Sequence, residues 1–426
     1  MNIQSYKLPT DWQIEAIKDA YRFTKKPRNL DAKENSEIPF IPMELIPLGK
    51  LFVDNWVMKP TKKLGSGTYF ENGDLLVAKI TPSFENGKQA IAKINCSFGY
   101  ATTEVIPIQE IEGTSDKFYL HFILLHPGIR KELAEKMDGS TGRQRLSKEI
   151  LGSKKIPLPP HKEQQRIAYV LSMVQTAIEQ QERLIKITRE LKSALMHKLF
   201  TEGLRGEKQK MTEIGPVPES WEIGAIRDIA QVKGGKRLPK GDKLVEYKTN
   251  YPYLRVTDFE ENSVNVAGLK YLLPETQQRI RRYIISDKDV FISIAGTIGL
   301  TGMIPVELNG ANLTENAAKI VLRTDKLISR FLMYYLSTDN SQKEIHSQTV
   351  KNAQPKLALS RIESLKIPIP SKDEQEEIVN ILDTLRQRVI LIQRKRFSLE
   401  ELFRTLLHQL MTGQTRVNEI DLSGFK

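Results

Sequence analysis

Two segments that lie half a chain apart are similar throughout, and this repeat constrains the fold more than any other feature. Residues 156–204 and 367–415 align at one constant shift of about 211 residues, without a gap. Each begins with Ile-Pro-x-Pro and carries a Glu-Gln pair shortly afterwards, at Glu163 and Glu374. A repeat at half the chain length indicates two versions of one structural unit.

The repeat extends to the start of each half, where a proline is followed by a turn and a tryptophan. Residues 9–20 are similar to residues 218–229, and Trp12 corresponds to Trp221. Both tryptophans lie in short alternating apolar runs, which are typical of a β-strand and favour a core position over base stacking. Each start leads into about 140 to 150 residues of short apolar runs broken by Gly, Asn and Pro, an ordinary size for a β-rich domain.

Each repeated segment is predicted to form one long helix that ends near Gly203 or Gly413. Apolar residues recur at spacings of three, four and seven, the stripe of a coiled coil, and the other copy is the obvious partner for each stripe. About 40 residues at about 1.5 Å each give a rod of roughly 60 Å. The residues predicted to pair are Ile167, Leu171, Val174, Ile178, Ile185, Leu191, Leu195, Leu199, Ile378, Leu382, Leu385, Val389, Leu399, Leu402, Leu406 and Leu410. The polar residues that interrupt the stripes, and that either set the register or face a third partner, are Gln181, Thr188, Arg388 and Lys395.

The composition excludes several classes of protein. With 426 residues, 40% of them hydrophobic, the chain is expected to form two to four folded domains. Cys96 is the only cysteine, which excludes a disulfide scaffold and a thiolate metal site, and the sequence suggests neither a membrane span nor a signal peptide. The net charge of +12 favours a polyanionic partner, first nucleic acid and second an acidic membrane, over a merely basic surface. We therefore expect a cytoplasmic protein.

Motifs for catalysis are absent or weak. The nearest approach to a methyltransferase motif, Leu-Pro-Pro-His at residues 158–161, lacks a polar residue to hold a base amino group and is better explained as a helix start. No GxxxxGK[ST] nucleotide loop and no HExxH metal motif occur. Carboxylate-x-lysine triplets such as residues 31–33 arise often by chance. The sequence therefore predicts no catalytic residue, no metal ion and no cofactor in this chain.

Basic, amide and hydroxyl side chains recur on loops at equivalent places in the two halves. Arg and Lys can contact phosphates or guanine edges, and Asn and Gln can contact adenine. The candidate DNA-binding residues are Lys25, Lys26, Arg28, Lys79, Thr81, Ser83, Asn86, Lys88, Arg143, Gln144, Arg145, Lys233, Lys236, Arg237, Lys240, Thr297, Lys351, Asn352, Gln354 and Lys356. The alternative for each is an ordinary solvated loop, and recurrence in two diverged copies makes binding about as well supported as that alternative. Glu104 and Glu315 also recur, each after a threonine, and a structural hydrogen-bonding role is at least as well supported for them as a functional one.

The order of these elements resembles the specificity (S) subunit of type I restriction-modification systems. Two units, each with a Pro-x-x-Trp-x-Ile start and then IPLPPHKEQQRI or IPIPSKDEQEEI before a long helix, carry the resemblance over nearly the whole chain. It implies an α+β fold with two β-rich target recognition domains separated by an antiparallel pair of long helices (a coiled coil), in a pseudo-two-fold internal repeat. The expected segments are residues 1–155 (first recognition domain), 156–204 (first spacer helix), 205–216 (linker), 217–366 (second recognition domain), 367–413 (second spacer helix) and 414–426 (C-terminal tail).

The resemblance also implies a function. A chain of this kind would bind double-stranded DNA and read a bipartite, asymmetric target with one domain per half-site, without catalytic activity of its own. Two modification (M) subunits would hold S-adenosylmethionine and methylate adenine at N6, and restriction (R) subunits would add cleavage that depends on ATP and Mg; no membrane is involved. On the residues alone two alternatives stay open: a self-contained DNA-modifying or DNA-cleaving enzyme, and a coiled-coil interaction scaffold whose basic loops are incidental.

Overall fold

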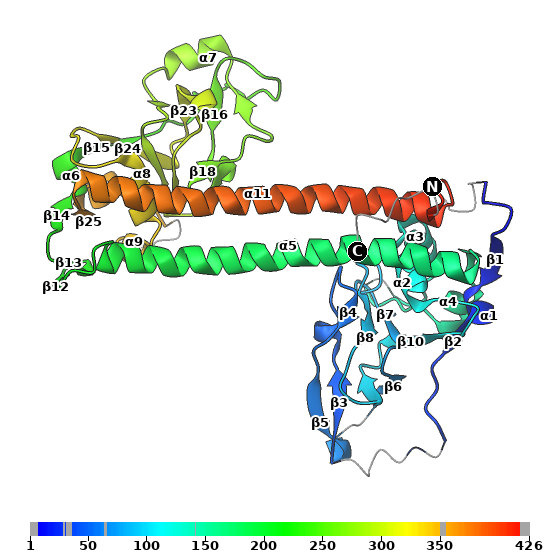
Figure 1. The fold of residues 1–426 in the computed structure, drawn as a ribbon. Helices are drawn as coiled ribbons and strands as arrows, with labels where there is room; N and C mark the ends of the chain where they lie inside the picture. Colours follow the sequence, from blue (N-terminus) through cyan, green and yellow to red (C-terminus); the bar gives the residue numbers. More distant parts are fainter. Residues whose placement is uncertain are drawn as a thin grey trace. The chain divides into compact units, whose positions relative to one another are not determined.

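The chain folds into two compact units. Unit 1 comprises Met1–Ile185 and Leu391–Lys426, and unit 2 comprises Lys186–Ile390. The computed structural model describes residues 7–28, 30, 36–63, 66–140, 142–349 and 355–417. Each unit contains one β-rich half of the chain and half of each long helix, α5 (His161–Glu202) and α11 (Lys372–Met411) (Figure 1). The predicted segments separate the spacer helices from the recognition domains, whereas this division assigns half of each helix to each unit.

Unit 1 is built on two β-sheets. Its other elements are β1 (Gln13–Ala16), α1 (Ile17–Ala20), β2 (Tyr21–Phe23), β3 (Glu37–Ile41), β4 (Phe52–Val53), β5 (Val57–Pro60), β6 (Thr68–Glu71), β7 (Leu75–Ala78), β8 (Gln89–Ala92), β9 (Phe98–Ala101), β10 (Val105–Glu110), α2 (Lys117–Leu125), α3 (Pro127–Ala134), α4 (Lys148–Ser153) and β11 (Lys155–Leu158). One sheet has the order β2-β10-β7-β8-β4 and the other β5-β3-β9-β6. The main core joins the first sheet to α2, the start of α5 and the end of α11, through residues such as Ile106, Phe122, Leu171 and Leu410.

Unit 2 repeats this plan. Its elements are β12 (Gln209–Thr212), β13 (Gly215–Pro218), β14 (Glu222–Ala225), α6 (Ile226–Ile229), β15 (Ala230–Gly234), β16 (Pro252–Leu254), β17 (Phe259–Glu260), β18 (Ser263–Val264), β19 (Lys270–Tyr271), α7 (Pro274–Arg279), β20 (Ile284–Ile285), β21 (Val290–Ser293), β22 (Thr301–Gly302), β23 (Ala311–Leu313), β24 (Ala317–Leu322), α8 (Ser329–Leu336), α9 (Asp339–Ser347), α10 (Leu359–Ser364) and β25 (Lys366–Ile369). Its sheets have the orders β15-β24-β21-β22 and β19-β16-β23-β20. The first of these corresponds strand for strand to β2-β10-β7-β8, so the two halves share one topology.

The two long helices run antiparallel within each unit. In unit 1, Glu182 of α5 lies 3.8 Å from Arg396 of α11 (carboxylate oxygen to guanidinium nitrogen). In unit 2, Leu199 near the end of α5 and Ile378 near the start of α11 belong to one core cluster. The predicted antiparallel helix pair is therefore confirmed.

Most of the residues predicted to pair along the helices are at least partly buried. The buried ones are Ile167, Leu171, Ile178, Ile185, Leu199, Ile378, Leu382 and Leu410, and the half-buried ones are Val174, Leu195, Leu385, Val389, Leu399 and Leu406. The prediction is wrong for Leu191 and Leu402, which are 52% and 45% exposed. A straight helix with 3.6 residues per turn drifts away from a strict seven-residue repeat, so some stripe positions rotate into solvent. Among the polar interruptions, Gln181 and Thr188 are buried, whereas Arg388 and Lys395 are exposed.

The Pro-rich lead of each repeated segment is a β-strand, which corrects the predicted helix boundaries. β11 pairs antiparallel with β1, and β25 pairs antiparallel with β14. Proline lacks a backbone N–H and is tolerated in such two-stranded edge pairings. The helices therefore begin at His161 and Lys372, several residues later than predicted. The predicted linker 205–216 also contains ordered structure, because β12 pairs with β13 from Gln209 onward.

A buried tryptophan is hydrogen-bonded to the first turn of the long helix in each unit. Trp12 Nε1 donates to Glu163 Oε2 at 3.1 Å, and Trp221 Nε1 donates to Glu374 Oε2 at 3.0 Å. Both tryptophans are buried, which confirms their predicted core position. Ser371 Oγ accepts from the Glu374 backbone N–H at 3.3 Å, which is one half of a capping box, while the Glu374 carboxylate accepts from the tryptophan instead of completing the box.

The glutamine that follows each of these glutamates is fully buried and completely hydrogen-bonded. Gln164 accepts from the Asp116 N–H at 3.0 Å, and Gln375 accepts from the Ile328 N–H at 2.8 Å. Each amide also donates to two backbone carbonyls, one of them that of a proline in the lead before the helix, Pro159 or Pro370. Removing a partner from such a buried group leaves an unsatisfied donor or acceptor, which is costly. We call these three residues in each unit the Trp–Glu–Gln clasp.

The predicted helix-ending glycines also serve this clasp. Gly203 and Gly413 have φ angles of +66° and +67°, which favour glycine. A Cβ on Gly413 would lie 2.4 Å from Pro9 and 3.7 Å from the Trp12 ring, and one on Gly203 would lie 2.9 Å from Pro218. The helix end can approach the start of each unit only because these positions lack a side chain.

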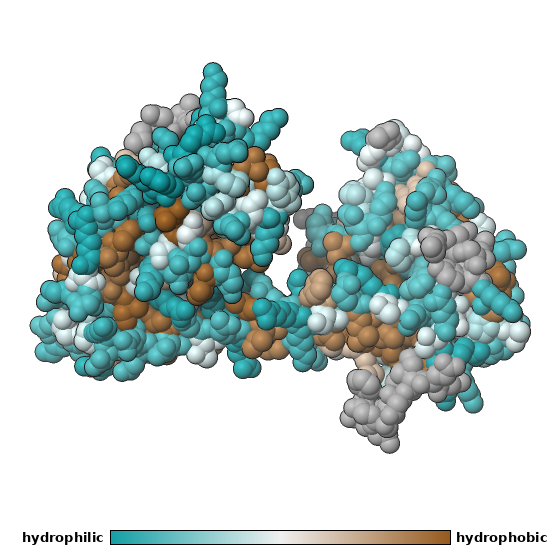
Figure 2. Space-filling view, turned by 90° about the horizontal axis from the view of Figure 1, so that it is seen from above, coloured by the Kyte–Doolittle hydropathy of each residue, from teal (hydrophilic) through white to brown (hydrophobic). Residues whose placement is uncertain are grey.

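The surface of both units is largely hydrophilic in the view of Figure 2, with apolar residues in scattered patches. Among the residues that the structure describes, no helix is long and apolar enough to cross a membrane.

Candidate nucleic-acid interface

In unit 1 the loop after β7 and the loop before α4 are joined by backbone hydrogen bonds. The Leu146 N–H donates to the Lys79 carbonyl at 2.7 Å, and the Thr81 N–H donates to the Gln144 carbonyl at 3.0 Å. The Lys79 N–H donates to the carbonyl of Glu104, just before β10. Three segments far apart in the sequence therefore meet here, and they bring together several of the predicted DNA-binding residues.

Glu104 and Arg145 form the polar centre of this meeting point. Arg145 Nε donates to Glu104 Oε2 at 3.0 Å, and Arg145 Nη2 donates to Oε1 at 3.0 Å, so the pair is bidentate. The Glu104 side chain is 22% exposed, whereas the Arg145 side chain is 55% exposed. The hydrogen bond from Arg145 lowers the pKa of Glu104 below its ordinary value, against the opposing effect of burial, and the charge of Lys79 helps. Arg145 is thus held by one edge while the rest of its guanidinium faces solvent.

Unit 2 places a similar pair at the equivalent glutamate, with an arginine from a different loop. Arg237, on the connection after β15, donates from Nε to Glu315 Oε1 at 2.6 Å. Its side chain is 80% exposed, and that of Glu315 is 26% exposed. Burial, the largest single effect, raises the pKa of Glu315, but the hydrogen bonds from Arg237, Thr314 and the backbone together with the charge of Arg237 lower it, and the net shift is downward. The residue at the position of Arg145 is Lys356, which forms a backbone bridge to Ala295 and is exposed.

Gly235 allows the Arg237 loop to lie against the strand that precedes Glu315. A Cβ on Gly235 would lie 2.0 Å from the Thr314 carbonyl oxygen, a distance that backbone atoms cannot accommodate. The next residue, Lys236, donates its N–H to the Leu313 carbonyl at 2.8 Å and accepts from the Tyr253 hydroxyl at 2.9 Å. The fold therefore fixes the base of this loop and leaves the Arg237 side chain exposed.

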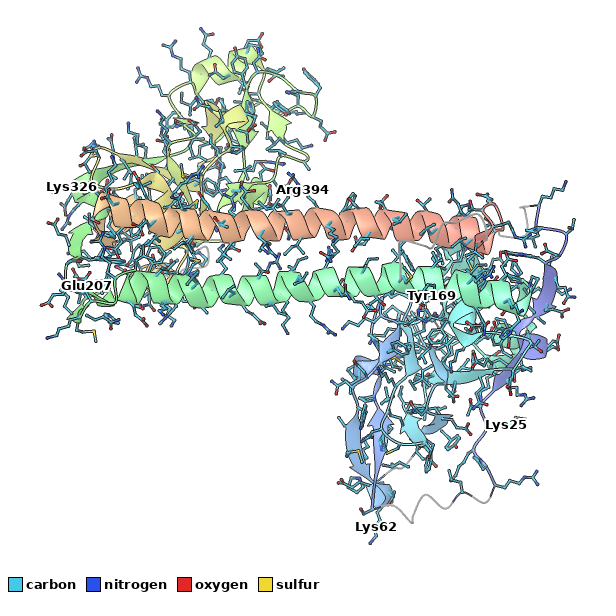
Figure 3. All side chains as sticks on the ribbon, viewed as in Figure 1. Lys25, Lys62, Tyr169, Glu207, Lys326 and Arg394 are labelled. Atoms are coloured by element: carbon cyan, nitrogen blue, oxygen red, sulfur yellow. The ribbon has the colours of Figure 1, made fainter. Side chains whose placement is uncertain are left out.

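The other predicted residues divide into exposed ones and ones with internal bonds. The exposed ones are Lys25, Lys26, Arg28, Asn86, Arg143, Lys233, Lys236, Lys240, Thr297 and Lys356. Figure 3 places Lys25 on the open connection that follows β2. Thr81 donates to Glu85 at 2.8 Å and Lys88 donates to the Met43 carbonyl at 2.7 Å, so both are used within unit 1. Ser83 is half-buried, and Lys351, Asn352 and Gln354 lie outside the described residues.

The sequence predicts the two arginines as candidates but does not predict how they are held. Glu104 and Glu315 recur in the sequence, yet nothing in it shows that each binds an arginine 41 or 78 residues away. Within the described residues, no group of three or more His, Cys, Asp or Glu side chains is placed to hold a metal ion. The arrangement offers exposed guanidinium and ammonium groups, which suit contacts to phosphates and guanine edges.

Comparison with known proteins identifies the family. Residues 9–189 and 218–401 match the family described as "Type I restriction modification DNA specificity domain". The chain belongs to the type I restriction-modification specificity subunits. As a specificity subunit it serves in DNA recognition and is non-catalytic.

Two similar curated proteins come from Methanocaldococcus jannaschii. The putative type I restriction enzyme MjaX specificity subunit is 26% identical over 424 residues, which cover 96% of this specificity subunit and 95% of the relative. The type I restriction enzyme MjaVIII specificity subunit is 22% identical over 330 residues, 76% of each chain. Among solved structures, the S subunit of a type I system from M. genitalium has the same fold, with a TM-score of 0.60 at 18% identity over 95% of this chain and 97% of that one.

Proposed function

We propose that this specificity subunit reads a split, asymmetric sequence in double-stranded DNA, with one unit for each half-site. The observation that carries the proposal is the pair of exposed arginines, Arg145 and Arg237, held on the equivalent glutamates Glu104 and Glu315. The two units share one topology but present different side chains at this point. Two units that differ in this way would read two different half-sites.

The chemistry of each pair suits base recognition. A guanidinium can donate two hydrogen bonds to guanine O6 and N7, the commonest specific contact in the major groove. Glu104 and Glu315 reduce the freedom of the arginine before binding, which lowers the entropy lost on contact. Nearby lysines such as Lys25, Lys236 and Lys240 are exposed and can neutralise phosphates, which supplies affinity without sequence information.

The long helices are proposed to set the gap between the half-sites. α5 has 42 residues and α11 has 40, so each is roughly 60 Å long at about 1.5 Å per residue. Each helix takes part in both units without interruption. Removing seven residues, about two turns, from the middle of both helices should change the number of unspecified base pairs between the half-sites. An unchanged gap in a folded variant would contradict this part of the proposal.

The partners are proposed to be two modification subunits and restriction subunits, which would bring S-adenosylmethionine, ATP and Mg. Apolar side chains that the chain itself leaves exposed on the helices support docking of other proteins, for example Ile187 at 54% and Leu391 at 61% exposure. Such exposed apolar residues commonly mark contact surfaces when they gather. The assembled complex would act on DNA in the cytoplasm.

The test is selection of bound duplexes from a randomised pool by the purified full chain, followed by sequencing. We expect two blocks of specified bases separated by a gap of fixed length. Incubation of the same protein with S-adenosylmethionine and the selected duplex should give no methylation until a modification subunit is added. A single contiguous block, or uniform binding to all duplexes, would contradict the proposal.

A further inference from the structure

Unit 2 contains a cavity of about 270 Å³ that is lined by both of its sheets. The lining residues are Lys233 and Gly234 from β15, Lys319 from β24, Leu313 from β23, Ile284 from β20, and Arg282 and Tyr283 just before β20. The cavity therefore lies where the two sheets meet. It is also next to the Arg237 loop, because Lys236 is hydrogen-bonded to the Leu313 carbonyl.

Positive charge is concentrated at this cavity. Lys233 and Lys319 are direct cross-strand partners on β15 and β24, so their side chains leave the same face of the sheet side by side. Like charges placed directly opposite each other in an antiparallel pair are destabilising. Lys319 forms an ion pair with Asp289 at 2.9 Å, whereas neither Lys233 nor Arg282 forms an ion pair with another described residue. Two of the three cations thus lack a compensating carboxylate.

The fold does not need this charge, as unit 1 demonstrates. The strand registers place Thr24 and Pro107 of unit 1 where unit 2 has Lys233 and Lys319. Asp74, which precedes β7 as Asp289 precedes β21, accepts a hydrogen bond from Thr24 at 2.8 Å. Unit 1 therefore has a threonine and a proline where unit 2 has two lysines, and its aspartate binds a hydroxyl group rather than an ammonium group. Unit 2 thus carries a like-charge repulsion that unit 1 lacks. An anionic ligand bound between the lysines would offset this repulsion.

We propose that this cavity, the Lys233–Arg282–Lys319 pocket, binds a phosphate group. A guanidinium and an ammonium group are the side chains best suited to phosphate oxygens, and Tyr283 adds a hydroxyl group among the lining residues. The phosphate belongs either to the DNA backbone or to a free phosphorylated molecule. The pocket lies beside the Arg237–Glu315 pair, which favours a phosphate of the DNA backbone next to the bases that unit 2 reads. Only this assignment to the DNA backbone rests on the proposed function; phosphate binding itself does not.

The first test measures DNA affinity of the full chain as a function of salt. Each phosphate contact contributes a slope of about −0.9 in a plot of log affinity against log salt. We expect Lys233→Ala and Arg282→Ala each to reduce the slope by about that amount and to weaken binding for all sequences alike. Arg281→Ala is the matched control, because Arg281 is exposed but does not line the pocket, and it should leave the slope unchanged. Urea denaturation checks that all three variants are folded.

The second test uses inorganic phosphate as the probe, followed by ³¹P NMR line broadening with the full chain. Phosphate binding that is lost in the Lys233→Ala/Arg282→Ala variant supports the pocket. Competition by duplex DNA then assigns the site to a backbone phosphate, and its absence assigns it to a free phosphorylated molecule.

Unchanged slopes together with no difference in phosphate binding would overturn the inference. If Arg237→Ala still weakens specific binding in that case, the pocket has failed while the proposed function stands. If Arg237→Ala also has no effect, the proposed function has failed as well.

Discussion

Each unit is stabilised by its own Trp–Glu–Gln clasp, and the two clasps differ in the other hydrogen bonds that their glutamates accept. Glu163 of unit 1 and Glu374 of unit 2 both bind a buried tryptophan. The second oxygen of Glu374 accepts the Leu204 N–H at 3.0 Å, whereas that of Glu163 accepts Arg416 Nε at 2.7 Å. The Trp–Glu hydrogen bond is therefore the same in both units, whereas the group bound to the second glutamate oxygen differs.

The loops that carry charge differ more than the clasp. The equivalent glutamates take an arginine from the loop before α4 in unit 1 and from the loop after β15 in unit 2. The basic pocket of unit 2 corresponds to Thr24 and Pro107 in unit 1. The same scaffold therefore carries different charged side chains in the two units while both units keep the clasp.

Loss of the clasp should have the largest effect and should be similar in both units. Trp12→Ala and Trp221→Ala should each cost about 3–5 kcal/mol of stability in their own unit, because each removes a buried aromatic ring. Urea denaturation gives the cost, and hydrogen exchange with mass spectrometry locates it. The matched Trp→Phe variants keep most of the apolar surface and should cost about 1–3 kcal/mol through the hydrogen bond that the buried glutamate loses. A small loss of stability for one tryptophan variant and a large loss for the other would contradict equivalent roles of the two clasps.

Substitution of the clamped arginines should affect one half-site each. Arg145→Ala and Arg237→Ala should each weaken specific binding by about 1–3 kcal/mol, because each removes one bidentate base contact. Equilibrium binding to duplexes mutated in either half-site measures the effect. Lys131→Ala, at a side chain that is 78% exposed on α3, should leave binding unchanged. Equal loss of specificity at both half-sites in either arginine variant would contradict one unit per half-site.

Arg416 offers a way to sharpen the difference between the clasps. It donates four hydrogen bonds at 2.7–2.9 Å to Glu163 and Asp11, while its counterpart by the repeat, Arg205, is exposed. Because the group is partly exposed, Arg416→Ala should cost unit 1 only about 1–2 kcal/mol. Arg205→Ala should change unit 2 by less than about 0.5 kcal/mol. Urea midpoints of the two variants test this, and equal effects would show that the clasps do not differ as described.

A smaller difference should appear on acidification. Burial, with a contribution from the neighbouring His408, lowers the pKa of His126 to about 4. His126 is the N-cap of α3, and the N-cap of α9 in unit 2 is Thr338, which does not titrate. The unfolded chain has an ordinary histidine pKa near 6.5, so the stability is fully present above that pH and is lost as the pH falls from about 6.5 to 4. At pH 6 the loss should be about 0.8 kcal/mol.

This loss can be measured by urea unfolding followed through tryptophan fluorescence in Trp221→Phe, where the remaining tryptophans, Trp12 and Trp56, lie in unit 1. His126→Ser should flatten the pH dependence. A pH dependence that His126→Ser leaves as steep as before would exclude this histidine as the cause.

Much of the fold could be predicted because its signals are local or repeated. The stripe of apolar residues predicted both long helices, and the shared starts predicted the burial of Trp12 and Trp221. The strand character of β11 and β25 could not be predicted, because their partners lie more than 130 residues earlier, in β1 and β14. Prolines before a helix look the same whether or not a distant strand pairs with them.

The candidate site was predictable only as a set of loops. Exposed basic residues could be read from the sequence, but the partners of Arg145 and Arg237 depend on three segments that meet through tertiary structure. The basic pocket could not be predicted from the sequence, because Arg282 lies just before β20 and Lys319 lies within β24, so neither belongs to a charged loop.

The central claim is that one chain with two differing units reads two different half-sites. Its most direct test is to co-express the chain with its modification subunit and to map methylated adenines across the genome, for the wild type, Arg145→Ala and Arg237→Ala. We predict one motif with two specified blocks and a fixed gap, in which each variant relaxes a different block. A contiguous motif, or relaxation of both blocks by a single substitution, would contradict the account.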